Sequence, residues 1–103
     1  MAIVQATDQT FYEETKEGYI LVDFWATWCG PCKMLTPVLE QLDADNSISK
    51  IVKLEVDANP VIAQEYGIMS VPTMLLMRDG EIVAKTMGYQ PKELLQQFIA
   101  DHQ

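Results

Sequence analysis

The sequence of 103 residues is poor in basic side chains, in cysteine and in histidine. Its 7 Lys and Arg residues stand against 15 Asp and Glu residues, so the formal net charge at pH 7 is −8. A surface this acidic repels phosphate backbones and anionic lipid, which argues against binding to nucleic acids or to membrane surfaces. Two cysteines and one histidine also leave few ligands for a metal site.

Long hydrophobic runs are absent as well: no stretch approaches the roughly 18 apolar residues that a membrane-spanning helix needs. The N-terminal stretch MAIVQATDQTF has no basic segment followed by an apolar run, and no small-residue cleavage site follows it. We therefore expect a cytoplasmic protein. Thiols are kept reduced in that compartment, so two cysteines close together favour catalysis or metal binding over a structural cross-link.

The sequence also lacks internal repeats, linkers and low-complexity runs, which predicts a single domain spanning residues 1–103. Hydrophobic residues make up 49% of the chain, enough for a core that needs no disulfide to replace it. Apolar and β-branched runs predict strands at residues 2–6, 19–26, 51–56, 74–77 and 82–87. The last two flank Asp79-Gly80, which is typical of a two-residue hairpin turn.

Helices are predicted between the strands and after the last one, at residues 8–16, 32–42, 60–67 and 91–100. The first helix is expected to be capped by Thr7 or Asp8. Pro37 lies inside the second helix and should kink it, because proline removes one backbone hydrogen bond. The third helix should begin after Asn59 as its N-cap and stop at Gly67.

This order of elements predicts an α/β fold. Right-handed crossovers join the early strands in parallel and the hairpin adds an antiparallel pair, which gives a mixed sheet with helices on both faces. In open α/β sheets the chemistry gathers beyond the carboxyl ends of the parallel strands. Cys29 and Cys32 follow the buried run 19–26 at such an end, so this pair is the leading candidate for a functional site.

Three uses of the cysteine pair are open. A structural cross-link over so short a loop removes only about 1.9 kcal/mol of chain entropy from the unfolded state, and short loops strain the bond. A structural zinc site needs four N or S ligands, whereas the chain offers Cys29, Cys32 and His102, so a metal site would need a dimer. The third use is reversible redox chemistry.

The sequence supplies what redox chemistry needs. Cys29 is expected at or just before a helix N-terminus, where unpaired N–H groups and the helix dipole favour a thiolate, with Cys32 one turn further on. Pro31 has a preset φ that suits the first turn, and Gly30 lets the backbone turn tightly. The Cys29 thiolate would attack a target disulfide, and Cys32 would then attack Cys29 and release the reduced target.

The motif WCGPCK, preceded by VDFWA and followed by VPT and the DG of the hairpin, resembles the thioredoxin family over essentially the whole chain. The resemblance implies the thioredoxin fold, with a central five-stranded mixed sheet and four flanking helices. It also implies a thiol–disulfide oxidoreductase with no cofactor or metal of its own. In addition, it implies a substrate-binding surface around the motif, in which Trp28, Gly30 and Pro31 lie beside the nucleophile. From the sequence alone, Trp28 could equally be a core tryptophan.

Two further residues take a catalytic role from the resemblance. Asp23 interrupts a buried apolar run, so desolvation should raise its pKa. The resemblance implies that it accepts the proton of Cys32 through solvent; the alternative is an acid that turns outward at a strand end or that pairs structurally. Lys53 matches the family lysine near that acid, whereas on its own it is typical of an exposed strand lysine.

The remaining site residues come from the segments that match the family's groove. Val71-Pro72 resembles its cis-proline turn, although only about 5–6% of X–Pro bonds in folded proteins are cis. A cis-Pro72 would leave the Val71 backbone free to pair with an extended substrate. Gly88 and Tyr89 match a third groove segment, where close backbone approach would require the glycine. Ser70 departs from the glycine of many relatives, which bears on substrate preference.

The Gly-Pro pair between the cysteines offers no hydrogen bond or positive charge to stabilise the Cys29 thiolate strongly, which favours a reductant. The resemblance implies electrons from NADPH through the flavoprotein thioredoxin reductase. It implies clients such as ribonucleotide reductase, peroxiredoxin and methionine sulfoxide reductase. We expect a monomer. The alternative is a binding module, in which the groove is an assembly surface and the thiols are incidental.

Overall fold

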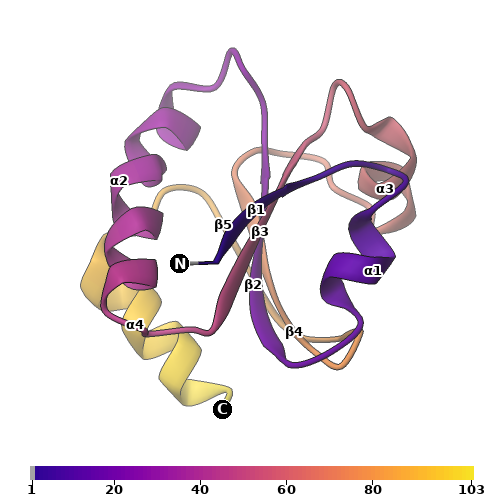
Figure 1. Ribbon diagram of the computed structural model, residues 1–103. Helices are drawn as coiled ribbons and strands as arrows, with labels where there is room; N and C mark the ends of the chain where they lie inside the picture. The colour runs from indigo at the N-terminus through magenta and orange to yellow at the C-terminus, as the bar shows by residue number, and fades with distance from the viewer. Residues whose placement is uncertain (1) are drawn as a thin grey trace.

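The computed structural model describes residues 2–103 and contains a five-stranded mixed sheet with helices on both faces (Figure 1). The strands are β1 (Ile3–Ala6), β2 (Tyr19–Trp25), β3 (Lys50–Glu55), β4 (Thr73–Arg78) and β5 (Glu81–Met87). The helices are α1 (Phe11–Thr15), α2 (Gly30–Ala44), α3 (Pro60–Glu65) and α4 (Lys92–Asp101). The predicted fold class and order of elements are confirmed, with element ends that differ by a few residues.

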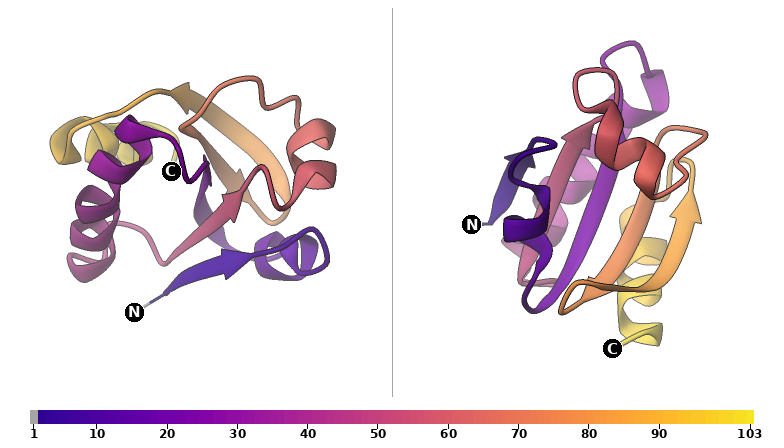
Figure 2. Two further views of the ribbon diagram at one scale, coloured as in Figure 1. Left: turned by 90° about the horizontal axis from the view of Figure 1, so that it is seen from above. Right: turned by 90° about the vertical axis from the view of Figure 1, so that its right-hand side faces the viewer.

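The strands lie in the order β1-β3-β2-β4-β5. Strands β1 and β2 both run parallel to β3, whereas β4 is antiparallel to β2 and to β5. Helices α2 and α4 cover one face of the sheet, and α1 and α3 cover the other (Figures 1 and 2). The central strand β2 is therefore covered on both faces, which explains why its sequence is a nearly continuous apolar run.

The core has one large cluster on each face of the sheet, and a smaller third cluster surrounds the cysteines. On the α2 and α4 side, Leu21 of β2 packs with residues such as Leu39 and Leu95. On the α1 and α3 side, Phe24 packs with Phe11 and its neighbours. Successive side chains of a strand point to opposite faces, so odd-numbered residues of β2 point toward α2.

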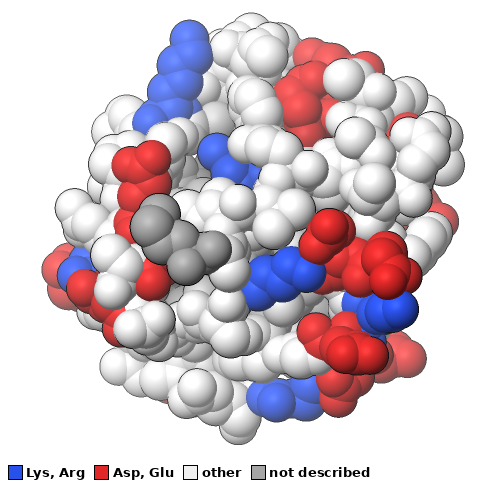
Figure 3. Space-filling model, viewed as in Figure 1, with Lys and Arg blue, Asp and Glu red and all other residues white. Residues whose placement is uncertain are grey.

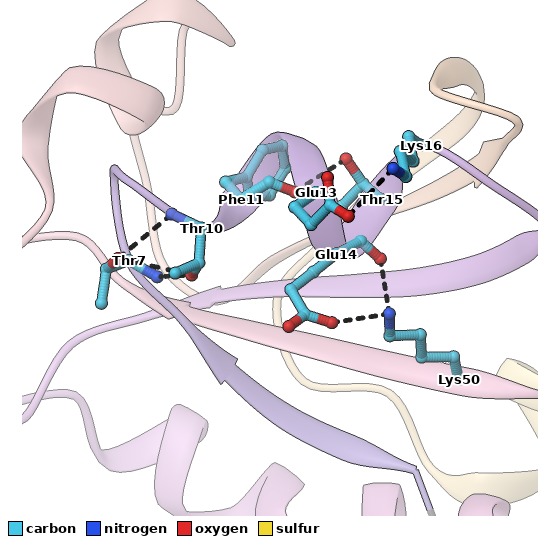
Figure 4. A network of polar contacts seen from close by, with 8 residues as sticks. All are labelled: Thr7, Thr10, Phe11, Glu13, Glu14, Thr15, Lys16 and Lys50. Carbon is cyan, nitrogen blue, oxygen red and sulfur yellow. Dashed lines mark hydrogen bonds and ion pairs between the residues drawn. The ribbon is translucent and has the colours of Figure 1, made fainter.

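The first helix is shorter than predicted, because α1 begins at Phe11 and not at residue 8. In the preceding turn, Thr7 and Thr10 exchange hydrogen bonds between their side-chain oxygens and backbone N–H groups, at 2.8 and 3.2 Å (Figure 4). The N-cap residue of α1 is Thr10, so the prediction that Thr7 or Asp8 caps this helix is wrong. Thr7 instead holds the preceding turn, whose side-chain hydrogen bonds compete with helical ones. Lys50 of β3 then ties α1 to the sheet through the Glu14 carbonyl (2.8 Å) and carboxylate (2.7 Å). Acidic side chains gather over α1 on the face shown in Figure 3.

Asp8 caps a different helix from the one predicted. Its two carboxylate oxygens accept the N–H groups of Ile62 (2.9 Å) and Val61 (3.2 Å) at the start of α3. Asn59 is the N-cap residue of α3 by position, as predicted, but its side-chain oxygen accepts the Asp8 N–H (3.0 Å). The loop after β1 therefore holds the N-terminus of a helix more than 50 residues away in the sequence.

Two predicted chain reversals are confirmed. Gly67 has a φ of +64° just after α3, and the Ile68 N–H donates to the Ala63 carbonyl (2.9 Å), which is the pattern of a Schellman cap. In the hairpin, Asp79 and Gly80 have φ values of +51° and +85°, as a type I′ turn requires.

Helix α2 continues through Pro37, so the proline does not end it. The kink at Pro37 stays a prediction. Within residues 2–103, no helix is long and apolar enough to cross a membrane.

Replacing Asp8 tests the long-range cap of α3. Asp8→Ala removes the acceptor of two N–H groups, and lost caps cost about 1 kcal/mol, so the free energy of unfolding should fall by about 1–2 kcal/mol. Asp8→Asn keeps one side-chain oxygen and should lose less. Urea denaturation of both variants beside the parent chain, followed by circular dichroism, measures the difference. Equal stability of the parent and Asp8→Ala would show that the cap contributes nothing.

Candidate active site

The two cysteines lie where the chain passes from β2 into α2. Cys29 is the N-cap residue of α2, Cys32 lies in its first turn, and a disulfide joins them, with Cα atoms 5.2 Å apart. The backbone N–H of Cys32 donates to Cys29 Sγ (3.1 Å). Because a helix N-terminus presents N–H groups and a positive dipole, this position favours a thiolate on Cys29 once the disulfide is opened. The predicted placement of the pair is confirmed.

Both sulfurs are set into a small apolar cluster, and Cys29 is only 3% exposed. The cluster includes Ala26 and the half-buried side chains of Trp25, Val56 and Val71. Neither Trp25 nor Val56 was expected at the site from the sequence. Both stand at the carboxyl end of a strand that leads to the predicted site, and this shared position was the signal that could have identified them.

The Val71–Pro72 peptide bond is cis, as the resemblance implied. The Val71 carbonyl oxygen lies 3.6 Å from Cys29 Sγ. The Pro72 carbonyl in turn accepts the N–H of Gly88 (2.8 Å), which follows β5. Three segments that are far apart in the sequence thus meet at one end of the sheet.

The structure corrects the reasons given for two glycines. Close approach does not explain Gly88, because a Cβ there would meet no atom within 4 Å in the described part of the chain. Gly88 instead has a φ of +87°, a conformation that disfavours other residues. Gly30 is the first residue of α2 and has no such φ, and a Cβ there would also enter open space. The turn into α2 therefore does not depend on a glycine.

Trp28 is exposed and is not a core residue, which excludes the alternative left open by the sequence. Its side chain is 69% exposed, and its Nε1–H donates to Asp57 Oδ2 (2.9 Å). Trp28 forms one side of a groove of about 120 Å³, lined also by Val56, Ile68, Met69, Ser70 and Val71. Asp57 was missed in the sequence, although it follows β3 at the same edge of the sheet.

Of the other predicted groove residues, Ser70 lines the groove and Tyr89 does not. The Ser70 hydroxyl lies 3.6 Å from the sulfur of Met87, and its carbonyl accepts the Thr73 hydroxyl (2.7 Å). Tyr89 is 39% exposed and directly follows Gly88. Pro31 is exposed in the first turn of α2. Of the two loop segments outside the motif, the Val71–Pro72 turn contacts Cys29 directly through the Val71 carbonyl, and Gly88 is hydrogen-bonded to that turn. The role of the predicted residues in substrate binding stays a prediction.

Asp23 is buried in β2, 1% exposed, on the face covered by α2. Its Oδ1 atom has no hydrogen-bond partner among residues 2–103. Burial raises the pKa of Asp23 from 3.8 to about 7, and the Lys53 ammonium lowers it by a smaller amount. The predicted rise in pKa is confirmed. The alternative of an acid that turns outward at a strand end is wrong.

Lys53 is the direct neighbour of Asp23 in the pairing of β2 with β3. It is half-buried, and its Nζ atom lies 5.2 Å from the centre of the Trp25 ring, within reach of a cation–π interaction. The lysine is therefore a half-buried neighbour of Asp23 and Trp25 rather than a freely exposed strand residue.

The three possible metal ligands, Cys29, Cys32 and His102, do not lie together in one chain. His102 lies beside the C-terminus, at the opposite end of the molecule from the start of α2 (Figure 1). Its Nδ1 atom lies 2.8 Å from the Phe98 carbonyl. Within residues 2–103, no three His, Cys, Asp or Glu side chains are grouped so that they could hold a metal ion.

Comparison with known proteins agrees with this geometry. The family model for thioredoxin matches residues 2–101. The chain belongs to the thioredoxin family. It is 55% identical over 103 residues to the thioredoxin of Bacillus subtilis (strain 168), an alignment that covers 99% of each chain. Over 103 residues it is 52% identical to a thioredoxin of Staphylococcus aureus (strain Mu50), again with 99% of each chain covered. It is 50% identical over 98 residues to that of Listeria monocytogenes, covering 94% of this chain and 95% of the relative.

Thioredoxin-family membership and the disulfide between Cys29 and Cys32, which are separated by two residues, make the chain a thiol–disulfide oxidoreductase. The structure holds the oxidised member of the couple.

The two glycines near the disulfide form a matched pair for a stability test. Gly88→Ala forces a Cβ into a left-handed conformation, so the free energy of unfolding should fall by about 1–2 kcal/mol. Gly30→Ala places a Cβ in open space at the start of a helix and should change it by less than about 0.5 kcal/mol. Urea denaturation of the oxidised proteins compares the two. A larger loss in Gly30→Ala would contradict the assignment of strain to Gly88.

The titration of Asp23 predicts a pH-dependent stability. The unfolded chain ionises Asp23 near pH 3.8, whereas the folded chain holds the proton until about pH 7. The free energy of unfolding is thus highest below pH 4, where Asp23 is protonated in both states. It falls by at most about 4 kcal/mol as the pH rises from 4 to about 7. Asp23→Asn lacks this titration, so relative to the parent it should gain stability between pH 4 and pH 8. Urea denaturation at several pH values measures the difference, and a constant offset across that range would show that Asp23 does not titrate there.

Proposed function

We propose that this chain reduces disulfide bonds in client proteins, acting as a monomer and as a single domain of residues 1–103 in the cytoplasm. The observation that carries the proposal is the position of Cys29 Sγ. This sulfur accepts an N–H at the start of α2 and lies 3.6 Å from the Val71 carbonyl, close to an open groove. An extended client segment that lies in the groove can bring its own disulfide to this sulfur.

In the reduced chain, the Cys29 thiolate attacks one sulfur of the client disulfide. A mixed disulfide forms while the client bond breaks, and the second client sulfur leaves as a thiolate. Cys32 then attacks Cys29 Sγ, which releases the first client sulfur and leaves the disulfide seen in the structure. Two electrons pass to the client, whose two sulfurs take up protons as they become thiols.

Asp23 is the proton acceptor for Cys32 in this mechanism, with solvent between the two groups. A base is most effective when its pKa lies near the working pH, and the pKa of about 7 for Asp23 supports the role. Lys53 pairs with Asp23 across the sheet and favours the carboxylate that has to accept the proton. Both residues act behind the disulfide, on the side away from the client.

The client-binding surface consists of three segments around Cys29. We assign to it Trp28, Gly30, Pro31, Ser70, Val71, Pro72, Gly88 and Tyr89. The position of Val71 in the groove lining, with its carbonyl beside Cys29 Sγ, supports pairing of the client backbone with Val71. The open space beside Gly30 supports a close approach of the client to the first turn of α2.

Reduction of the chain completes the cycle. We propose that the two electrons come from NADPH through thioredoxin reductase, and that clients include ribonucleotide reductase, peroxiredoxin and methionine sulfoxide reductase. The Gly-Pro pair between the cysteines supports this direction, because it leaves the reduced form without strong stabilisation of its thiolate.

A trapping experiment tests the reaction and the unequal roles of the cysteines. The parent chain should accelerate the reduction of insulin by dithiothreitol. Cys32→Ser leaves the attacking thiolate but cannot resolve the intermediate, so mixed disulfides through Cys29 should accumulate and be visible by non-reducing gel electrophoresis and mass spectrometry.

Cys29→Ser is the matched control and should neither accelerate insulin reduction nor trap clients. Trapping through Cys32 in that variant would reverse the assignment. No acceleration by the parent chain would contradict the reductase function and would favour the binding module, in which the groove serves only for assembly.

A further inference from the structure

We propose that Glu55 is a positioning residue: its carboxylate fixes Asp57, and through Asp57 it orients the indole ring of Trp28 at the groove. This inference rests on the proposed role of Trp28 as a wall of the client-binding groove. Glu55 is the last residue of β3 and is half-buried. Its place at the carboxyl end of a strand puts it at the same edge of the sheet as the disulfide.

Both oxygens of the Glu55 carboxylate accept hydrogen bonds from the turn that follows β3. Its Oε2 atom accepts the N–H of Asp57 (3.0 Å), and its Oε1 atom accepts the N–H of Ala58 (2.9 Å). Hydrogen bonds to an ionised carboxylate are stronger than those between neutral groups. Two consecutive backbone N–H groups are therefore held by one side chain, which fixes the direction in which the Asp57 side chain leaves the turn.

The backbone carbonyl of Glu55 also holds this turn through hydrogen bonds. The backbone N–H and the side-chain amide of Asn59 both donate to this oxygen, each at 3.1 Å. The Asn59 side-chain oxygen in turn accepts the N–H of Asp8. The end of the turn is thus anchored independently of the Glu55 carboxylate, so loss of the carboxylate should loosen residues 57 and 58 without unfolding the region.

Asp57 transmits this constraint to the groove. Its Oδ2 atom accepts the Nε1–H of Trp28 at 2.9 Å, and both side chains are exposed. With 69% of Trp28 exposed, packing alone restrains the ring weakly, and the hydrogen bond decides its orientation. A hydrogen bond between two exposed groups competes with water, so it orients the ring well only if its acceptor is held in place. Glu55 holds the acceptor, Asp57, in place.

The alternative is that Glu55 merely stabilises its own turn. The two N–H groups that it binds belong to exposed residues and can bond to water when the carboxylate is removed, so both alternatives predict a small effect on stability. They differ in the coupling to Trp28. A positioning residue changes the state of the Trp28 N–H, and its effect on client binding vanishes when that N–H is absent.

The experiment is a double-mutant cycle of Glu55→Ala and Trp28→Phe in the full chain, with insulin as the client. Glu55→Ala should raise KM about two- to tenfold, the equivalent of one hydrogen bond, with kcat little changed. In the Trp28→Phe background, which lacks the indole N–H, it should have no further effect. Glu40→Gln, a change of an exposed acid on α2, is the matched control and should leave KM unchanged.

A spectroscopic measurement gives a second, independent reading. The indole N–H signal of Trp28, assigned by its loss in Trp28→Phe, should shift in the NMR spectrum of Glu55→Ala and exchange faster with water. An unchanged signal, or the same rise in KM in both backgrounds, would overturn the inference. Failure of the proposed reductase function would look different, because the parent chain itself would not reduce insulin while the NMR comparison would still report on Glu55.

Discussion

Strand β2 is paired with parallel β3 on one side and with antiparallel β4 on the other, and helices cover both of its faces. The five central residues of such a strand are buried, and only its end residues are half-buried, so the strand is held in place by pairing on both sides and by packing on both faces. The site depends on that constraint. The chain leaves β2 into α2 with Cys29 as the cap, β3 brings Lys53 beside Asp23, and β4 begins directly after the cis-proline turn.

The same burial determines the chemistry of Asp23. An ionised carboxylate in this position has lost its hydration, so the folded chain keeps the proton until the pH approaches 7. At higher pH the ionised acid lowers the stability of the fold, since the unfolded chain solvates it freely. The unfavourable contribution to stability and the suitability for proton transfer near pH 7 therefore have one physical cause. A strand that buried only apolar residues would be more stable but would lack the carboxyl group that we propose as the base for Cys32.

Most of the fold could be predicted from the sequence because it follows from local patterns. The apolar run at residues 19–26 predicts a central strand, Asp79-Gly80 predicts the hairpin, and CGPC at a strand-to-helix junction predicts a cysteine at a helix cap. The contacts that escaped prediction join residues far apart in the chain. Asp8 caps α3 across more than 50 residues, and Asp57 binds Trp28 across 29. A polar residue in a loop has no sequence pattern that names its partner, so only the folded chain reveals which helix or side chain it holds.

Gly88 shows another limit of prediction from sequence. Its position near the disulfide was expected, but the physical reason for a glycine there was not. Its φ of +87°, rather than a close neighbour, accounts for the glycine, and φ is a property of the folded loop. The residues of the site fall into a buried group and an exposed group. The reacting sulfurs and Asp23 are buried and held by regular elements, whereas Trp28 and Met69, at 69% and 94% exposed, stand on loops at the rim of the groove. Exposed loop side chains add little to folding, so the hydrogen bonds that orient them, such as those of Asp57 and Glu55, have a larger effect on recognition than on stability.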